Sequence, residues 1–253
     1  MKRKDVLPKF APLFTAAVIV IVWAGLSLAV NEEIILPSPV KVAEEFALLF
    51  TSGEFYAGYF STLLRSLIAF AASFLLAFAA AAGARKSRVF TRVVMTVLPL
   101  VRALPTVAVA LLLVLWTSSR AAAVIVTMLV VFPTLYTNAE NALSRITRDM
   151  AEMCRVYRIP FRTKLLKIYL PAAAPSAVLA AGAGLSLNVK LMVAAEVIAA
   201  AARGIGPQLN ADKINFETAH MLALVLAVVL TGIAIELAAR ALSRAMVKRY
   251  AYV

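Results

Sequence analysis

The chain has 253 residues, of which 63% are hydrophobic and only 15% are charged, and its mean hydropathy is +0.90. Soluble domains are about half apolar and about a quarter charged, so this composition excludes an ordinary water-soluble domain and indicates a bilayer protein. The formal net charge of +13 would suit nucleic-acid binding in a soluble protein. Here the basic residues lie in the gaps between apolar runs, which favours a membrane topology signal and no nucleic-acid partner.

Few residues of this chain suit catalysis or metal binding. A single cysteine, Cys154, excludes an internal disulfide, and a single histidine, His220, occurs without the spacings typical of zinc sites. We therefore expect no metal site, and we interpret His220 as an interfacial histidine at the start of the last apolar run. The sequence contains no G-x-x-x-x-G-K-[ST] loop for ATP and no Ser/His/Asp or paired-carboxylate arrangement, so an enzyme is not expected.

Six apolar runs approach or exceed the length of about 20 residues that a membrane-spanning helix needs. They are residues 11–30, 62–84, 93–116, 121–138, 172–202 and 219–239. The first run follows MKRK and could be read as a signal peptide, but its length and the poor cleavage sequence LSLAVN favour a retained helix. The predicted fold class is therefore an all-α polytopic membrane protein with six transmembrane helices.

The basic residues predict which side of the membrane each gap faces. Nineteen of the 26 lysines and arginines lie before the first run, in the second and fourth gaps, and after the last run. They are Lys2, Arg3, Lys4, Lys9, Arg85, Lys86, Arg88, Arg92, Arg145, Arg148, Arg155, Arg158, Arg162, Lys164, Lys167, Arg240, Arg244, Lys248 and Arg249. Because positively charged gaps stay in the cytoplasm, both termini are expected there.

Two of the remaining gaps carry recognisable local signals. In the first gap, Ser38 and Pro39 predict the start of a short amphipathic helix on the outer face, and Gly53 predicts its end. In the fifth gap, the segment 204–207 reads Gly-Ile-Gly-Pro, but no strand precedes it and no Walker lysine follows. We therefore expect a turn that re-enters the membrane edge rather than a phosphate-binding loop.

The fourth gap, residues 141–171, is the longest cationic insert in the chain. It predicts a first short helix capped by Thr147 or Asp149, then a second that starts at Pro160 and ends where Pro171 begins the fifth run. Two short amphipathic helices joined at a bend would form a rigid knob at the inner membrane surface. A pair of helices lying on anionic lipid fits the same residues equally well.

The insert resembles the EAA loop of permease subunits in bacterial ABC importers, whose pattern is E-A-A, three residues, G, nine residues, I-x-L-P. Glu152 takes the first position, and Ile168 to Pro171 supply the end at the family's spacing. Other matching segments are Leu36-Pro37-Ser38-Pro39, Ser61-x-x-x-Arg65-Ser66, Leu98-Pro99, Leu104-Pro105, Ala195-Glu196 and Gly204-Ile205-Gly206. Together they are similar to the nitrate, sulfonate and taurine branch of these permeases, over residues 36–249.

The resemblance implies a MetI-like permease fold, with residues 1–35 as an N-terminal tail and first helix and 36–253 as the permease core. It implies that the loop 141–171 inserts into a cleft on a separate ATPase, which binds ATP and Mg while this chain binds no cofactor. The coupling residues would be Glu152, Met153, Cys154, Arg155, Arg158, Ile159 and Pro160. Met153 and Cys154 replace the two alanines and Arg158 replaces the glycine, so we expect the Ile159-Pro160 pair to supply the bend.

Several charged residues fall within or near the apolar runs, where a charge costs about 2.5–3.5 kcal/mol at the bilayer centre. Arg65 either reaches the interface or serves transport, and Arg102 lies between two prolines where a broken helix is expected to line a cavity. Lys190 and Glu196 are six residues apart, a spacing that does not place them on one face of a straight helix, so we expect no direct pair.

The candidate translocation-path residues are Arg65, Arg102, Lys190 and Glu196. One lysine and two arginines near a path would suit an anionic solute, unless Glu196 and Glu236 neutralise them.

These features predict the permease subunit of an ATP-driven importer in the bacterial plasma (inner) membrane. Expected partners are membrane lipid, a second permease copy forming a homodimer, two ATP-binding subunits and an extracytoplasmic solute-binding protein. The solute would be a sulfonate, taurine, nitrate or a vitamin-precursor heterocycle. The alternative is an ATP-independent secondary transporter or channel, which inverted repeats or paired mid-membrane carboxylates would favour. A scaffold without transport activity would leave Arg102 and Lys190 unexplained.

Overall fold

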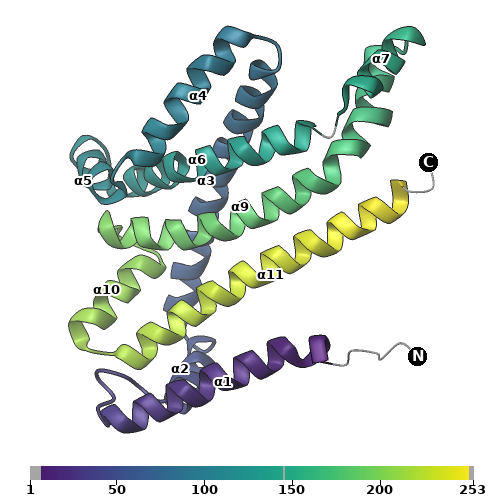
Figure 1. The fold of residues 1–253 in the computed structure, drawn as a ribbon. Helices are drawn as coiled ribbons and strands as arrows, with labels where there is room; N and C mark the ends of the chain where they lie inside the picture. The colour runs from purple at the N-terminus through teal and green to yellow at the C-terminus, as the bar shows by residue number, and fades with distance from the viewer. Residues whose placement is uncertain (1–6, 145, 251–253) are drawn as a thin grey trace, which may run out of the picture. The chain divides into compact units, whose positions relative to one another are not determined.

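The computed structural model describes the backbone of residues 7–144 and 146–250, and the side chains of residues 14–248 except residue 145. Helices make up most of this part of the chain, and it contains no strand (Figure 1). The all-α prediction is therefore confirmed. Some residues of the topology argument, or their side chains, lie outside the described residues: Lys2, Arg3, Lys4, Lys9, Arg145 and Arg249.

The chain divides into two compact units. The first comprises the described residues up to Tyr56 together with Gln208–Ala227, and the second comprises Ala57–Pro207 together with the described residues from Val228 onward. These units follow spatial contacts, so they do not coincide with the boundary expected at residue 35. That boundary stays a prediction.

The first unit contains α1 (Leu7–Val30), α2 (Pro39–Leu49), the first turn of α3 (Gly53–Ala84), most of α10 (Ile205–Asn215) and the start of α11 (Thr218–Tyr250). The indole Nε1 of Trp23 donates to the Pro37 carbonyl at 3.1 Å, which ties α1 to the segment before α2. The Ser38 side chain accepts from the Lys41 amide at 3.2 Å, and Pro39 occupies the first helical position. The predicted short helix and its cap are thus confirmed.

The second unit contains the rest of α3 and α11, with α4 (Arg88–Ala103), α5 (Thr106–Trp116), α6 (Ser119–Ser144), α7 (Arg148–Val156), α8 (Phe161–Thr163), a π-helical stretch (Lys164–Tyr169) and α9 (Leu170–Ile198). Helices α6 and α9 lie side by side in Figure 1. Alanines dominate one core cluster, in which Ala69, Ala110, Ala123 and Ala195 are buried together. Small residues let membrane helices approach closely, which suits packing without a hydrophobic driving force.

Four helices are long and apolar enough to cross a membrane, at Gly53–Ala84, Ser119–Ser144, Phe161–Ile198 and Thr218–Lys248. Helices α4 and α5 form a fifth, broken candidate bent by 92° at Leu104-Pro105, where the prolines predicted a break. The first run forms α1, but its described apolar part, Phe14–Val30, is shorter than a full crossing. The described residues therefore give four or five spans, and the predicted count of six is not confirmed.

Candidate functional site

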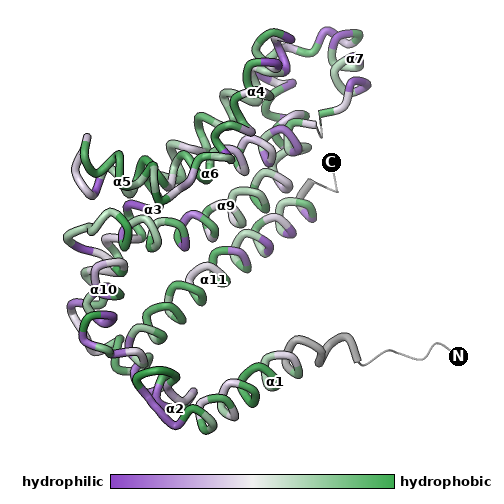
Figure 2. The backbone as a smooth tube through the Cα atoms, turned by 60° about the vertical axis from the view of Figure 1, so that its left-hand side comes forward, coloured by the Kyte–Doolittle hydropathy of each residue, from purple (hydrophilic) through white to green (hydrophobic). Residues whose placement is uncertain are grey.

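The insert forms the helix α7 at the ends of α6 and α9, and Figure 2 shows polar residues gathering along it. Thr147 is its N-cap, since the Thr147 Oγ1 accepts a hydrogen bond from the Met150 amide at 3.3 Å. Asp149, the other predicted cap, lies instead in the first turn, where its charge complements the helix dipole. The sequence therefore located the start of this helix correctly.

The end of α7 differs from expectation. Arg158, which stands at the glycine position of the EAA pattern, adopts a left-handed backbone with a φ of 47°. Its amide donates to the Arg155 carbonyl at 3.1 Å, and the Ile159 amide donates to the Cys154 carbonyl at 3.0 Å. These are the two hydrogen bonds of a Schellman motif, which needs a left-handed residue at this point. The expectation that Ile159-Pro160 would replace the glycine bend is wrong, because the arginine itself takes the glycine conformation.

The predicted second helix is not a separate element. Pro160 caps α8, and the chain continues without a break through the π-helical stretch into α9. Pro171 has no N–H, and its ring crowds the carbonyl of Lys167, four residues earlier. Directly before Pro171 the Leu170 amide donates to the Leu165 carbonyl, five residues earlier, which is the hydrogen bond of a π-helical turn. Pro171 therefore lies inside one long helix, Phe161–Ile198, instead of starting the fifth span.

We call residues 148–161 the coupling knob. Its surface carries three large apolar side chains, Val156, Tyr157 and Phe161, which are 77%, 76% and 76% exposed. Of the predicted coupling residues, Cys154 is buried and Ile159 half-buried, while the other five are exposed: Glu152, Met153, Arg155, Arg158 and Pro160. A helix end that exposes apolar and charged groups together is typical of a contact surface.

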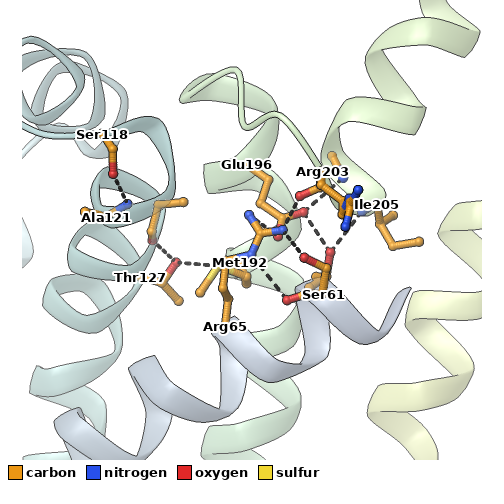
Figure 3. A network of polar contacts seen from close by, with 12 residues as sticks. Ser61, Arg65, Ser118, Ala121, Thr127, Met192, Glu196, Arg203 and Ile205 are labelled. Carbon is orange, nitrogen blue, oxygen red and sulfur yellow. Dashed lines mark hydrogen bonds and ion pairs between the residues drawn. The ribbon is translucent and has the colours of Figure 1, made fainter. Parts of the chain in front are cut away.

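A second group of predicted residues converges inside the membrane-spanning helices (Figure 3). The Arg65 Nη1 lies 3.2 Å from the Glu196 Oε1, and the two side chains are only 10% and 0% exposed. Arg65 also donates from Nη2 to the Ser61 hydroxyl at 2.7 Å and to the carbonyl of Arg203. Arg65 is thus buried and paired with a carboxylate, rather than reaching toward the interface.

The other oxygen of Glu196 holds the segment that follows α9. Glu196 Oε2 accepts hydrogen bonds from the Thr62 hydroxyl at 2.8 Å and from the Gly206 amide at 3.1 Å. The Thr62 hydroxyl oxygen in turn accepts from the Ile205 amide at 2.9 Å. Sequence reasoning missed Thr62, although its position three residues before Arg65 places both on one helix face.

The glycines of this turn are required by close contact. Gly204 has a φ of 145°, and a Cβ there would lie 2.4 Å from Glu196 Oε2. A Cβ on Gly206 would lie 2.4 Å from the Glu196 Cβ. Only glycine lets the backbone approach the carboxylate this closely. Three segments of the family pattern, around Ser61-Arg65, Glu196 and Gly204-Gly206, therefore form one polar network.

Arg102 and Lys190 are exposed in the described chain. Arg102, at the end of α4, donates from Nη2 to the Pro133 carbonyl at 3.3 Å and to the Thr137 hydroxyl at 3.0 Å. Lys190 lies beside Gly232, where an added Cβ would come 3.2 Å from the Lys190 Cε. Neither lies in the network of Arg65 and Glu196.

Glu236, the other carboxylate considered as a neutralising group, has its own partner. Glu236 Oε2 lies 3.3 Å from the Arg240 guanidinium, one turn along α11. Glu196 therefore neutralises Arg65, and Glu236 pairs with Arg240 of its own helix, so neither carboxylate neutralises Arg102 or Lys190.

The family model described as "Binding-protein-dependent transport system inner membrane component" matches residues 73–248. The chain belongs to this family. It is 30% identical over 206 residues to the SsuC permease protein of Escherichia coli (strain K12), named for aliphatic sulfonates transport, covering 80% of this chain and 78% of that one. The SsuC of Bacillus subtilis (strain 168), named likewise, is 27% identical over 198 residues, covering 77% and 71%.

Solved structures support the fold of this permease. A chain from inward-facing conformations of the MetNI methionine ABC transporter superimposes with a TM-score of 0.64 at 20% identity, covering 75% of this chain and 94% of that chain. A second crystal form of the same transporter gives a TM-score of 0.61 at 19% identity. The predicted MetI-like fold is therefore confirmed, and so is the assignment to ABC importer permeases of the sulfonate and nitrate type.

Proposed function

We propose that this permease imports a small anion and is driven by a separate ATPase that docks on the coupling knob. The observation that carries the proposal is the exposed apolar surface of the knob, formed by Val156, Tyr157 and Phe161 at the end of a capped helix. An amphipathic helix that presents such side chains fits a groove on a partner protein.

The connection of the knob to the membrane explains how force would be transmitted. The chain that leaves the knob at Phe161 runs without a break into α9. A displacement of the knob by the closing ATPase would therefore move α9 as a rigid body, which is a common way to switch access to a transport path. ATP and Mg would bind to the ATPase alone.

The assembly we propose has two permease copies, two ATPases and an extracytoplasmic solute-binding protein in the bacterial plasma membrane. The basic residues near the knob and near the end of α11 support a cytoplasmic location for both termini. A closed two-fold dimer is the commonest arrangement for identical subunits. The description of the family as binding-protein-dependent supports the third partner.

The intramembrane cations support an anionic solute. Since Glu196 neutralises Arg65, the exposed Arg102 and Lys190 are the cations left to face a path. Exposing either side chain to lipid at mid-membrane would be costly, which favours a water-filled path or a partner copy. Arg65 and Glu196 stay candidates for the path, but their burial favours a structural role in which their ion pair holds α3 against α9. The relatives named for aliphatic sulfonates make a sulfonate the first solute to test.

The ATPase contact is tested by purifying the permease in mild detergent from its native membrane, as wild type, Glu152→Arg and Glu44→Arg. Both substitutions reverse an exposed carboxylate, but Glu44 lies on α2 rather than on the knob. Mass spectrometry should identify an ABC ATPase with wild type and Glu44→Arg, and little with Glu152→Arg. An intact permease that retains no ATPase in any form would contradict the proposal and favour the ATP-independent transporter.

The anion preference is tested by uptake of a radiolabelled alkanesulfonate into cells that carry wild type, Lys190→Met or Lys190→Arg. We expect Lys190→Met to reduce uptake at least about tenfold and Lys190→Arg to retain more of it, because arginine keeps the positive charge. Equal uptake by Lys190→Met and wild type, at equal permease levels, would remove Lys190 from the path.

A further inference from the structure

Three residues that the transport proposal does not use come together where α10 ends and α11 begins. Asp212 lies in α10, Glu217 lies just before α11, and His220 lies in the first turn of α11. One ligand atom from each can be chosen so that all lie within 4.8 Å of one another. The closest pair is the His220 Nδ1 and the Asp212 Oδ2, at 2.8 Å.

The backbone of the turn fixes this arrangement. The Glu217 amide donates to the Asp212 carbonyl at 2.9 Å across Phe216, which has a left-handed φ of 59°. Glu217 and His220 are three residues apart at the start of a helix, so their side chains lie on the same side. Within helices, a Glu-x-x-His pair is a recurrent way to present one carboxylate and one imidazole to a metal ion; here Glu217 directly precedes the helix that carries His220.

The cluster opens into a cavity of about 300 Å³, which leaves room for water beside the three side chains. Gln208 lines the same cavity, and its Oε1 is buried without a hydrogen-bond partner among the described residues. Such a buried acceptor indicates that a donor or a cation is missing from its surroundings.

We propose that Asp212, Glu217 and His220 form a binding site for a divalent metal ion, with zinc as the first ion to test. Zinc accepts both imidazole nitrogen and carboxylate oxygen as ligands, and water from the cavity would take the fourth position. The ion would cross-link the end of α10 to the first turn of α11. This proposal does not depend on what the permease transports.

A simpler interpretation of this cluster than a metal site is an ordinary hydrogen bond between Asp212 and His220. Glu45 and Glu217 line a cavity beside His220, and Glu45 is paired with Lys41 at 3.9 Å. The histidine thus faces the carboxylates of Asp212 and Glu217, and a divalent cation would balance this charge better than an imidazole alone. The site was not predicted from the sequence, because these spacings match none of the common zinc patterns.

The test uses the full chain in detergent, purified without a polyhistidine tag, stripped with EDTA and re-equilibrated with zinc. Wild type, Glu217→Gln, His220→Ala and Glu44→Gln are compared by metal content after gel filtration and by competition with a chromophoric chelator. Glu217→Gln removes one ligand but leaves the Asp212–His220 hydrogen bond in place. Glu44→Gln removes an exposed carboxylate outside the cluster.

We expect one zinc ion per chain for wild type and Glu44→Gln, and no stoichiometric zinc for His220→Ala. Glu217→Gln should bind zinc at least about tenfold more weakly, since even loss of an outer-shell partner costs about 10–100-fold. If wild type retains no stoichiometric zinc, or if Glu217→Gln binds it as tightly as wild type, the site does not exist. The Glu217→Gln result decides the matter even if His220→Ala fails to fold.

Discussion

The coupling knob and the Arg65–Glu196 network are both built from segments of the family pattern, but they are built in opposite ways. The knob exposes apolar side chains and places a non-glycine residue, Arg158, in a left-handed backbone. The network buries both of its charged side chains and surrounds the carboxylate with an ion pair and two hydrogen bonds. An exposed helix end tolerates local strain, whereas a buried charge needs a counter-charge beside it.

Removing one charge from the network should have the largest effect. Glu196→Leu leaves the Arg65 guanidinium buried without its counter-charge, and breaking a buried pair in this way costs about 3–5 kcal/mol. We expect a loss of that size in the free energy of unfolding, measured by denaturant titration in mixed micelles.

The double variant Arg65→Met/Glu196→Leu separates the pair from the packing around it. Removing both charges should restore most of the loss, since apolar groups of similar volume often replace a buried pair at little cost. If the double variant is no more stable than Glu196→Leu, the ion pair is not what makes Glu196 important.

Filling the space beside Glu196 should have an intermediate effect. In Gly206→Ala the new Cβ meets the Glu196 Cβ and the Val197 amide nitrogen at 2.4 and 2.8 Å, and such overpacking costs about 1–3 kcal/mol. The matched control is Gly25→Ala in α1, where a Cβ would meet nothing within 4 Å. A thermal unfolding scan should show Gly206→Ala melting below wild type and Gly25→Ala at or above it. Equal melting temperatures for both variants would mean that the segment around Gly206 can shift away from Glu196 at no cost in stability.

The sequence was sufficient where local chemistry decides the structure. The Ser38 cap and the break at Pro105 follow from residue type alone, and Thr147 was one of the two caps that the sequence offered for α7. The structure contains all three features. The same is true of most long apolar helices, because their length and composition leave few alternatives in a bilayer.

The sequence was insufficient where contacts distant along the chain decide it. Arg65 and Glu196 are separated by more than a hundred residues, so their pairing depends on how α3 packs against α9. Pro171 favours a helix start by residue type, but the π-helical stretch before it lets one helix continue through the proline. Arg158 has a poor intrinsic preference for a positive φ, and the two Schellman hydrogen bonds impose it.

The smallest expected effect concerns the knob, and it is a gain in stability rather than a loss. A left-handed backbone costs a non-glycine residue about 1–2 kcal/mol, part of which glycine gives back through its larger entropy in the unfolded chain. Arg158→Gly should therefore stabilise the end of α7 by about 1 kcal/mol or less. Slower hydrogen exchange at the amides of residues 158 and 159 would show this directly.

Arg158→Ala is the control, because it removes the guanidinium and keeps the strain. If alanine slows exchange as much as glycine does, backbone strain is not the cause. The activity of the proposed partner ATPase, measured with Arg158→Gly and with Arg158→Ala, then tests whether the arginine side chain contacts the partner. If both variants support full ATPase activity, the Schellman turn alone shapes the knob. If both variants lose that activity, the arginine stands at the glycine position because its side chain contacts the partner.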